Sequence, residues 1–101
     1  MRHRELFLGF VKLHILYHAQ HEPLFGLAMI RELAHHGYSL SPGTLYPVLH
    51  KMEKEHLLRS SRKNVAGKIR KYYQITAVGC RALAQGVDKA RELFEEIGGN
   101  S

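Results

Sequence analysis

The middle of the chain constrains the fold most, because a strong helix-starting signal is followed by two segments that suggest extended structure. Ser41 offers a side-chain oxygen to cap the first amides of a helix, and Pro42 suits the first helical position, where no N–H is needed. Residues 58–63 and 69–76 then suggest two extended segments, and the second is rich in residues that favour strands. Gly67, between them, can supply the positive backbone angle of a hairpin turn. The sequence therefore predicts a helix followed by a β-hairpin.

The predicted helix runs from Ser41 to about Glu55, with its apolar residues on one side. Pro47 lies inside it and would remove the hydrogen bond to the Gly43 carbonyl, so we expect an irregular first turn. The inward stripe comprises Leu45, Val48, Leu49 and Met52.

Three further helices are predicted around this region. Residues 5–20 carry apolar side chains on nearly every side, which indicates a helix buried on more than one face. Residues 24–35 form a second helix, with Gly37 as its C-cap. The last helix starts at the cap Thr76 and has apolar residues at alternating spacings of three and four, the seam of a helix that packs lengthwise on another. We expect this seam to form a homodimer, or alternatively to lie on the chain's own helices.

Positive charge is concentrated in the centre of the chain, whose formal net charge is +6. Four basic and three acidic residues precede Ser41, and three basic and four acidic residues follow Ile75, so the flanks nearly cancel. Between them lie eight basic residues and two acidic ones. This distribution indicates a region that meets a polyanion, although a solvated basic face would give the same count.

Length and motifs exclude several classes of protein. A chain of 101 residues suits one domain with a modest core. No apolar run reaches the roughly 20 residues that span a bilayer, and the first residues lack a signal-peptide core, so we expect a cytoplasmic protein without a membrane segment. The sequence shows no catalytic triad, paired carboxylates, phosphate-binding glycine loop or metal quartet at useful spacing. We therefore expect neither an enzyme nor a cofactor.

Two stretches of the sequence resemble the PadR family of bacterial transcriptional regulators. The first is Ser41-Pro-Gly-Thr-Leu-Tyr-Pro-Val-Leu-His-Lys-Met-Glu53, followed by Leu57-Leu58. The second is Arg70-Lys-Tyr-Tyr-Gln-Ile-Thr-Ala-Val-Gly79. The resemblance covers nearly the whole chain, and the run from Gly43 to Pro47 is quite specific to the family. A small departure is His56, which stands where the family often has glycine.

This resemblance implies a mainly α-helical fold with a small β-hairpin. Residues 1–75 would form a winged helix-turn-helix domain and residues 76–101 a C-terminal dimerisation helix, together one continuous domain. The family resemblance further implies a sequence-specific regulator of double-stranded DNA, usually a repressor, that binds a near-palindromic operator as a homodimer.

In a helix-turn-helix, the second helix of the motif enters the major groove with its N-terminal part nearest the bases. Here that helix begins at Ser41, where free amides and the helix dipole favour phosphate. Tyr46 is expected either to contact DNA or to be a half-buried structural residue. Strand alternation places Lys68 and Arg70 on one face of the wing and Lys71 on the other. The predicted DNA-binding residues are Ser41, Gly43, Thr44, Tyr46, His50, Lys51, Arg62, Lys63, Lys68, Arg70 and Lys71.

The predicted dimerisation surface joins the first and last helices. It comprises Phe7, Phe10, Leu83, Val87, Ala90, Phe94 and Ile97. Aromatic residues of these helices, among them Tyr17, suit either ordinary packing or a pocket between subunits for a small-molecule effector, which the resemblance implies. Cys80 suits a small apolar role on the seam, a bridge across the dimer or an oxidant sensor.

Two alternatives remain open from the sequence. His14, His18 and His21 follow helical spacing that could serve a metal, or they could be polar residues at a helix surface or dimer edge. The basic wing could instead dock on a protein or on RNA.

Overall fold

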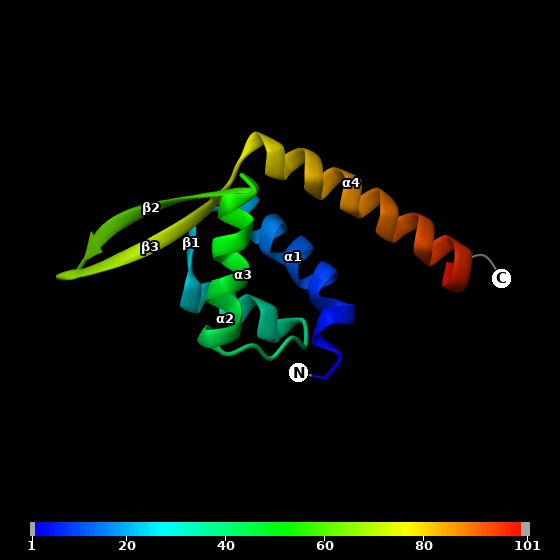
Figure 1. Cartoon of the computed structure of the whole chain (residues 1–101), viewed down its shortest axis with the longest axis horizontal. Coiled ribbons are helices and arrows are strands. Elements are labelled where there is room, and N and C mark those ends of the chain that lie inside the picture. Colours follow the sequence, from blue (N-terminus) through cyan, green and yellow to red (C-terminus); the bar gives the residue numbers. More distant parts are fainter. Residues whose placement is uncertain (1, 100–101) are drawn as a thin grey trace.

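A computed structural model describes residues 2–99 and shows a mainly helical chain with a small sheet, which confirms the predicted fold class. The elements are α1 (Arg4–His21), β1 (Leu24–Phe25), α2 (Gly26–His35), α3 (Pro42–Lys54), β2 (Leu58–Val65), β3 (Lys68–Ile75), α4 (Ala77–Phe94) and a final π-helical turn, η1 (Glu95–Gly99). The β2–β3 hairpin and α4 extend to opposite sides of a body made by α1, α2 and α3 (Figure 1). No helix among residues 2–99 is long and apolar enough to cross a membrane.

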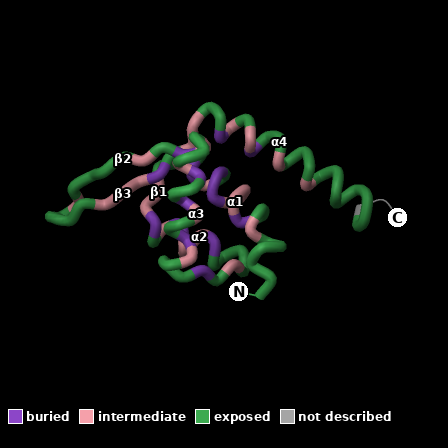
Figure 2. Tube along the Cα trace, viewed as in Figure 1, coloured by how far each residue is buried: buried purple, intermediate pink, exposed green. Residues whose placement is uncertain are grey.

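The core lies where α1, α2 and α3 meet the base of the hairpin. Buried side chains gather in these helices, whereas the far parts of the hairpin and of α4 are exposed (Figure 2). Tyr73 of β3 is among the largest fully buried residues and joins the hairpin to the helices. The buried apolar residues are Val11, Ile15, Leu16, Ala19, Met29, Leu33, Leu40, Leu45, Leu49, Met52, Leu58, Tyr73 and Leu83.

The helices α2 and α3 end in the same way, with one residue in the left-handed backbone conformation. After α2, Gly37 has φ of 86°, and the amide of Tyr38 donates to the Leu33 carbonyl (3.0 Å). After α3, His56 has φ of 63°, and the amide of Leu57 donates to the Met52 carbonyl (2.9 Å). Both patterns are those of a Schellman motif. His56 therefore occupies a backbone conformation that favours glycine, the residue that the family often has there.

The helix α3 begins as predicted but contains no irregular turn. Ser41 is its N-cap, Pro42 is its first residue, and the helix is continuous from there to Lys54 with Pro47 inside it. The expectation of an irregular start was wrong. The amides of Thr44 and Leu45 both donate to the Ser41 carbonyl, at 3.0 and 2.9 Å, so the first turn closes ahead of the proline.

The sheet has three strands rather than the two predicted, in the order β1–β3–β2. Leu24 and Phe25 pair with Tyr73 and Tyr72, so α2 starts at Gly26 and not at Leu24. In the hairpin the strands extend beyond the predicted segments, and two residues with positive φ connect them: Ala66 (51°) and Gly67 (81°). This two-residue connection matches the right-handed twist of the strands.

The start of α4 is joined to the end of α3. Thr76 caps α4 by accepting a hydrogen bond from the Gly79 amide (2.9 Å), and its own amide donates to the Leu57 carbonyl (3.2 Å). A Cβ atom at Gly79 would collide with that same Leu57 carbonyl, and one at Gly86 would collide with Leu13 of α1. Both glycines therefore permit close packing of α4 on the body, which explains a helix-weakening residue at position 86.

Candidate DNA-binding surface

The N-terminus of α3 is open to solvent. Ser41, Pro42 and Gly43 are exposed, and a side chain at Gly43 would meet nothing nearer than the Ser41 hydroxyl at 3.9 Å. That hydroxyl donates to Thr44 Oγ1 (3.2 Å) and does not cap the helix as predicted. No side chain of the described residues caps this end, which leaves a positive helix terminus accessible to an anion.

The outward face of α3 carries Tyr46, His50 and Lys51, all exposed. The Tyr46 ring is 38% exposed and packs against Gly26, where a Cβ atom would lie only 2.5 Å from the ring. Tyr46 thus holds α3 close to the start of α2 and also presents an edge to solvent. The two predicted roles of this tyrosine, structural residue and DNA contact, are compatible with one position.

The register of the hairpin divides its cations between two faces, as strand alternation predicted. Lys63 pairs with Arg70, and Lys68 lies two residues from Arg70 on the same strand, so these three side chains share one face. Arg62 pairs with Lys71 on the opposite face, the one that contains the buried Tyr73.

Aromatic rings position two of these cations. The Arg70 guanidinium lies 4.6 Å from the centre of the Phe25 ring, and Lys63 Nζ lies 5.0 Å from the centre of the Tyr72 ring. Phe25 and Tyr72 pack edge to face at 5.7 Å. Cations held over rings lose less conformational freedom when they meet a phosphate. The contacts of Phe25 with Arg70 and Tyr72 could not be predicted from the sequence, because they depend on strand β1.

Lys71 has a different environment from the other wing cations. Its Nζ lies 3.3 Å from Glu53 Oε1 of α3, and it is also 5.3 Å from the centre of the buried Tyr73 ring. Ser60 of β2 donates to the other oxygen of Glu53. The hydrogen bond from Ser60, followed by the hydrogen bond and charge of Lys71, lowers the pKa of Glu53 although partial burial opposes the shift. Lys71 therefore joins the wing to α3.

The predicted dimerisation residues fall into two groups. Phe7, Phe10, Val87, Phe94 and Ile97 are exposed, the last two by 63% and 72%. Leu83, by contrast, is buried in the chain's own core, and Ala90 is half-buried. Two residues that the sequence reasoning omitted add to the exposed apolar surface: Leu6 and Leu93.

An open apolar groove runs between α1 and α4. Its walls include Phe10, Tyr17, Cys80 and Val87, and the Leu83 side chain reaches its floor. Gln20 of α1 donates to the Cys80 sulfur (3.7 Å) across this groove.

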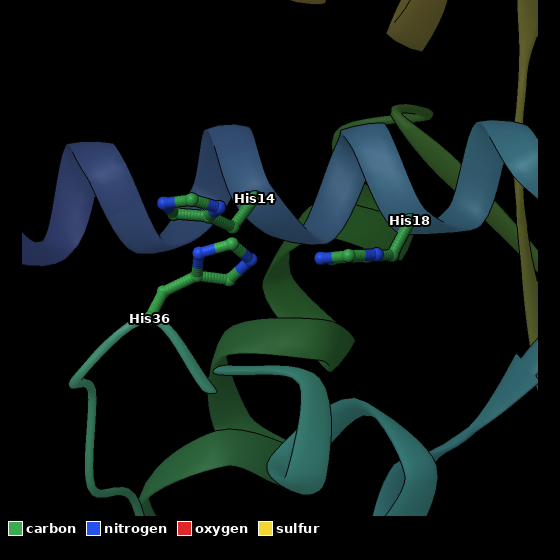
Figure 3. Close-up of side chains that lie close together, drawn as sticks. All are labelled: His14, His18 and His36. Atoms are coloured by element: carbon green, nitrogen blue, oxygen red, sulfur yellow. The ribbon is translucent and has the colours of Figure 1, made fainter. Parts of the chain in front are cut away.

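Histidines gather at the junction of α1 and α2, although not the three that sequence spacing suggested. His14 and His18 of α1 meet His36, which follows the last residue of α2 (Figure 3). His21 instead packs edge to face on Tyr17 at 4.5 Å. The contact with His36 depends on how α2 folds back on α1, so helical spacing along α1 could not indicate it.

An exposed helix N-terminus followed by a basic hairpin defines the winged helix-turn-helix class of DNA-binding domain. Residues 15–85 match the model of the transcriptional regulator PadR-like family. The transcriptional regulator Rv3488 of Mycobacterium tuberculosis is 42% identical over 99 residues, which cover 97% of this chain and 92% of that protein.

Solved structures agree with this match. A PadR family regulator from Eggerthella lenta superposes with a TM-score of 0.83 at 34% identity, covering 94% of this chain and 84% of that one. A PadR-like regulator from Bacillus cereus gives 0.85 at 29% identity, with 94% of both chains covered. The chain belongs to the PadR-like family of transcriptional regulators. It is therefore a DNA-binding regulator and not an enzyme, as the sequence predicted.

Proposed function

We propose that this regulator acts as a repressor that binds a near-palindromic operator as a homodimer. The observation that carries the proposal is the placement of two unlike surfaces on opposite sides of one body (Figure 1). One surface combines the open end of α3 with the basic wing, and the other is the exposed apolar part of α4. A chain with one surface for DNA and another for a second copy suits a two-fold operator.

On DNA, the N-terminal part of α3 enters the major groove. Gly43 and Thr44 approach the backbone there, while His50 and Lys51 follow along the exposed face. The wing cations Lys63, Lys68 and Arg70 contact flanking phosphates or the minor groove. Lys71, which pairs with Glu53, positions the wing against α3 and contributes less charge to DNA than its neighbours.

The second copy covers the exposed apolar residues of α4 and of η1, which follows it. Val87, Leu93, Phe94 and Ile97 are each between 44% and 72% exposed in the single chain. Apolar side chains exposed at this density along one helix are typical of a surface that another molecule covers. Phe7 and Phe10 of α1 extend the same surface, so the dimer would use the first and last helices.

A small-molecule effector would release the repressor by binding in the groove between α1 and α4. The groove is lined by aromatic and aliphatic side chains with few polar groups, among them His14, Gln20 and Asp88. Such a lining suits an aromatic or otherwise apolar compound with one or two polar groups. Because the groove borders the proposed dimer surface at Phe10 and Val87, a bound compound would alter how two copies pack.

The test of this proposal is selection of bound duplexes from a random DNA library, followed by titration of the best site at several salt concentrations. We expect enrichment of a two-fold sequence and a steep dependence of affinity on salt. Enrichment of no sequence, with binding that is weak at every duplex, would contradict a specific operator and leave protein or RNA docking as the function of the wing.

The wing is tested by a double substitution, Lys68→Ala with Arg70→Ala. Loss of these charges should weaken binding at all sequences and lower the salt slope by up to about two units for each chain bound. The matched control is Arg81→Ala with Lys89→Ala, which removes the same charge from exposed positions of α4. If both double variants had the same salt slope of DNA binding, the wing would not contact DNA.

A further inference from the structure

Three imidazole rings share one small volume at the junction of α1 and α2. His14 and His18 lie on consecutive turns of α1 and point toward His36, whose ring lies between them (Figure 3). The ring centres of His14 and His36 are 4.2 Å apart, those of His18 and His36 are 5.7 Å apart, and those of His14 and His18 are 6.4 Å apart. One ring nitrogen from each residue lies within 4.8 Å of the other two.

The two nitrogens of His18 have different surroundings. Nδ1 lies 3.9 Å from Glu32 Oε2 of α2, at ion-pair distance. Nε2 is buried and has no hydrogen-bond partner among residues 2–99. A buried nitrogen without a partner costs folding free energy, and a bound ligand at this position would remove that cost. A carboxylate near one imidazole nitrogen, here beyond hydrogen-bond distance, together with a free second nitrogen resembles the arrangement that metal-binding histidines commonly show.

Two of the three histidines have lowered pKa values. Burial, followed by the charges of His36 and His18, lowers the pKa of His14. Burial also lowers the pKa of His18, and the nearby His36 and His21 add to this shift while Glu32 opposes it. In both residues the shift favours the neutral imidazole, the form that has a lone pair for a metal ion.

We propose that His14, His18 and His36 form a Zn²⁺ site with a fourth position open to water or another ligand. Three neutral imidazoles suit zinc, whereas Mg²⁺ and Ca²⁺ prefer oxygen ligands. Zinc–nitrogen bonds of about 2.0–2.1 Å in a tetrahedron require nitrogens about 3.4 Å apart. Closing the present spacing of up to 4.8 Å requires side-chain rotation of the histidines, and His36 is exposed and lies in the connection after α2.

The site joins parts of the chain that the proposed DNA contacts do not use. A bound ion would link α1 to the end of α2, the helix that precedes α3 in the helix-turn-helix. His14 and His36 also line the groove between α1 and α4. The inference goes beyond operator binding, and its test needs no DNA, so failure of one proposal leaves the other standing.

The test is titration of Zn²⁺ into the metal-free full chain, with competition against a chromogenic chelator to measure affinity. We expect one zinc ion per chain. Substitution His36→Ala should weaken binding by at least about 100-fold, because it removes a direct ligand, whose loss should exceed the 10–100-fold effect typical of outer groups. The matched control is His35→Ala, one residue away at the same helix end, with its side chain 75% exposed.

Two further measurements distinguish a specific site at the three histidines from nonspecific binding of zinc to other histidines. Zinc should raise the melting temperature of the wild type and of His35→Ala, but not of His36→Ala. Co²⁺ in place of zinc should give the intense visible absorption of a tetrahedral site in the same two proteins only. If His36→Ala binds zinc as tightly as His35→Ala, or if the wild type binds no zinc, the proposal is wrong.

Discussion

The wing and α4 both leave the same body, and each differs between its base and its free end. At the bases, residues are buried or paired with α3: Tyr73 and Lys71 in the wing, and Gly79 and Leu83 in α4. At the ends, cations of the wing and large apolar residues of α4 are exposed (Figure 2). The buried bases contribute to the stability of the fold, whereas the exposed ends are free to contact a partner. Substitutions at the two places should therefore have separable effects.

The largest effect is expected at the end of α4. Substitution of Phe94 and Ile97 together by Glu should raise the dimer dissociation constant by more than about 100-fold, because central apolar residues of an interface commonly contribute 2 kcal/mol or more each. Sedimentation velocity over a range of concentrations measures this. Ile69→Glu is the matched control, since Ile69 is 72% exposed like Ile97 but lies on the wing. A double variant that sediments like the wild type would show that the exposed stripe is not the interface.

A smaller effect, and a different one, is expected at the base of α4. A Cβ atom at Gly79 would overlap the Leu57 carbonyl, a backbone atom that cannot move aside cheaply. Gly79→Ala should lower the free energy of unfolding by about 2 kcal/mol after the gain in helix propensity is counted. Urea unfolding in the Phe94/Ile97 double variant measures this without the contribution of the dimer.

Gly9→Ala is the control for this substitution, because a Cβ atom at Gly9 meets no atom within 4 Å. It should stabilise the same background by up to about 1 kcal/mol, the usual gain from glycine to alanine in a helix. If Gly79→Ala changed the free energy of unfolding by the same amount as Gly9→Ala, the close packing of Gly79 on Leu57 would not affect stability.

The smallest effect is expected at the base of the wing, and it depends on pH. The pKa of Glu53 is lowered in the folded chain, so its contacts with Ser60 and Lys71 stabilise above the ordinary carboxyl pKa and are lost as pH falls through the folded value. Glu53→Gln should cost about 1 kcal/mol at neutral pH, a figure reduced for solvent screening, and almost nothing once the pH falls below the folded pKa.

Urea unfolding at a series of pH values checks this prediction. The matched control is Glu55→Gln, which removes the same charge from an exposed carboxylate at the same helix end. A difference between Glu53→Gln and the wild type that stays constant with pH would show that the carboxylate charge does not hold the wing.

Local signals in the sequence were enough to predict most of the fold. Ser41-Pro42 identified the start of α3, Gly67 the hairpin turn and Thr76 the cap of α4, because each acts on its immediate neighbours. The short strand β1 was missed, since Leu24 and Phe25 become a strand only by pairing with β3.

Contacts between distant residues limited prediction of the site for the same reason. Apolar spacing placed Leu83 and Phe94 on one seam of α4, yet the body covers the first and leaves the second exposed. Charge counting grouped Lys71 with the other wing cations, although its pairing with Glu53 depends on where α3 ends. Spacing along one helix likewise could not show that His36 joins His14 and His18.

The joint at Thr76 has a consequence for the operator. This residue is hydrogen-bonded both to the connection after α3, at the His56 and Leu57 carbonyls, and to the first turn of α4. These hydrogen bonds restrain the angle between α3 and α4 within each chain. In the proposed dimer, each α3 turns together with its own α4, so the crossing angle of the two α4 helices sets the distance between the two half-sites. A small change in the crossing angle of the two α4 helices would move the two α3 helices relative to each other. Their spacing would then no longer match the helical repeat of DNA.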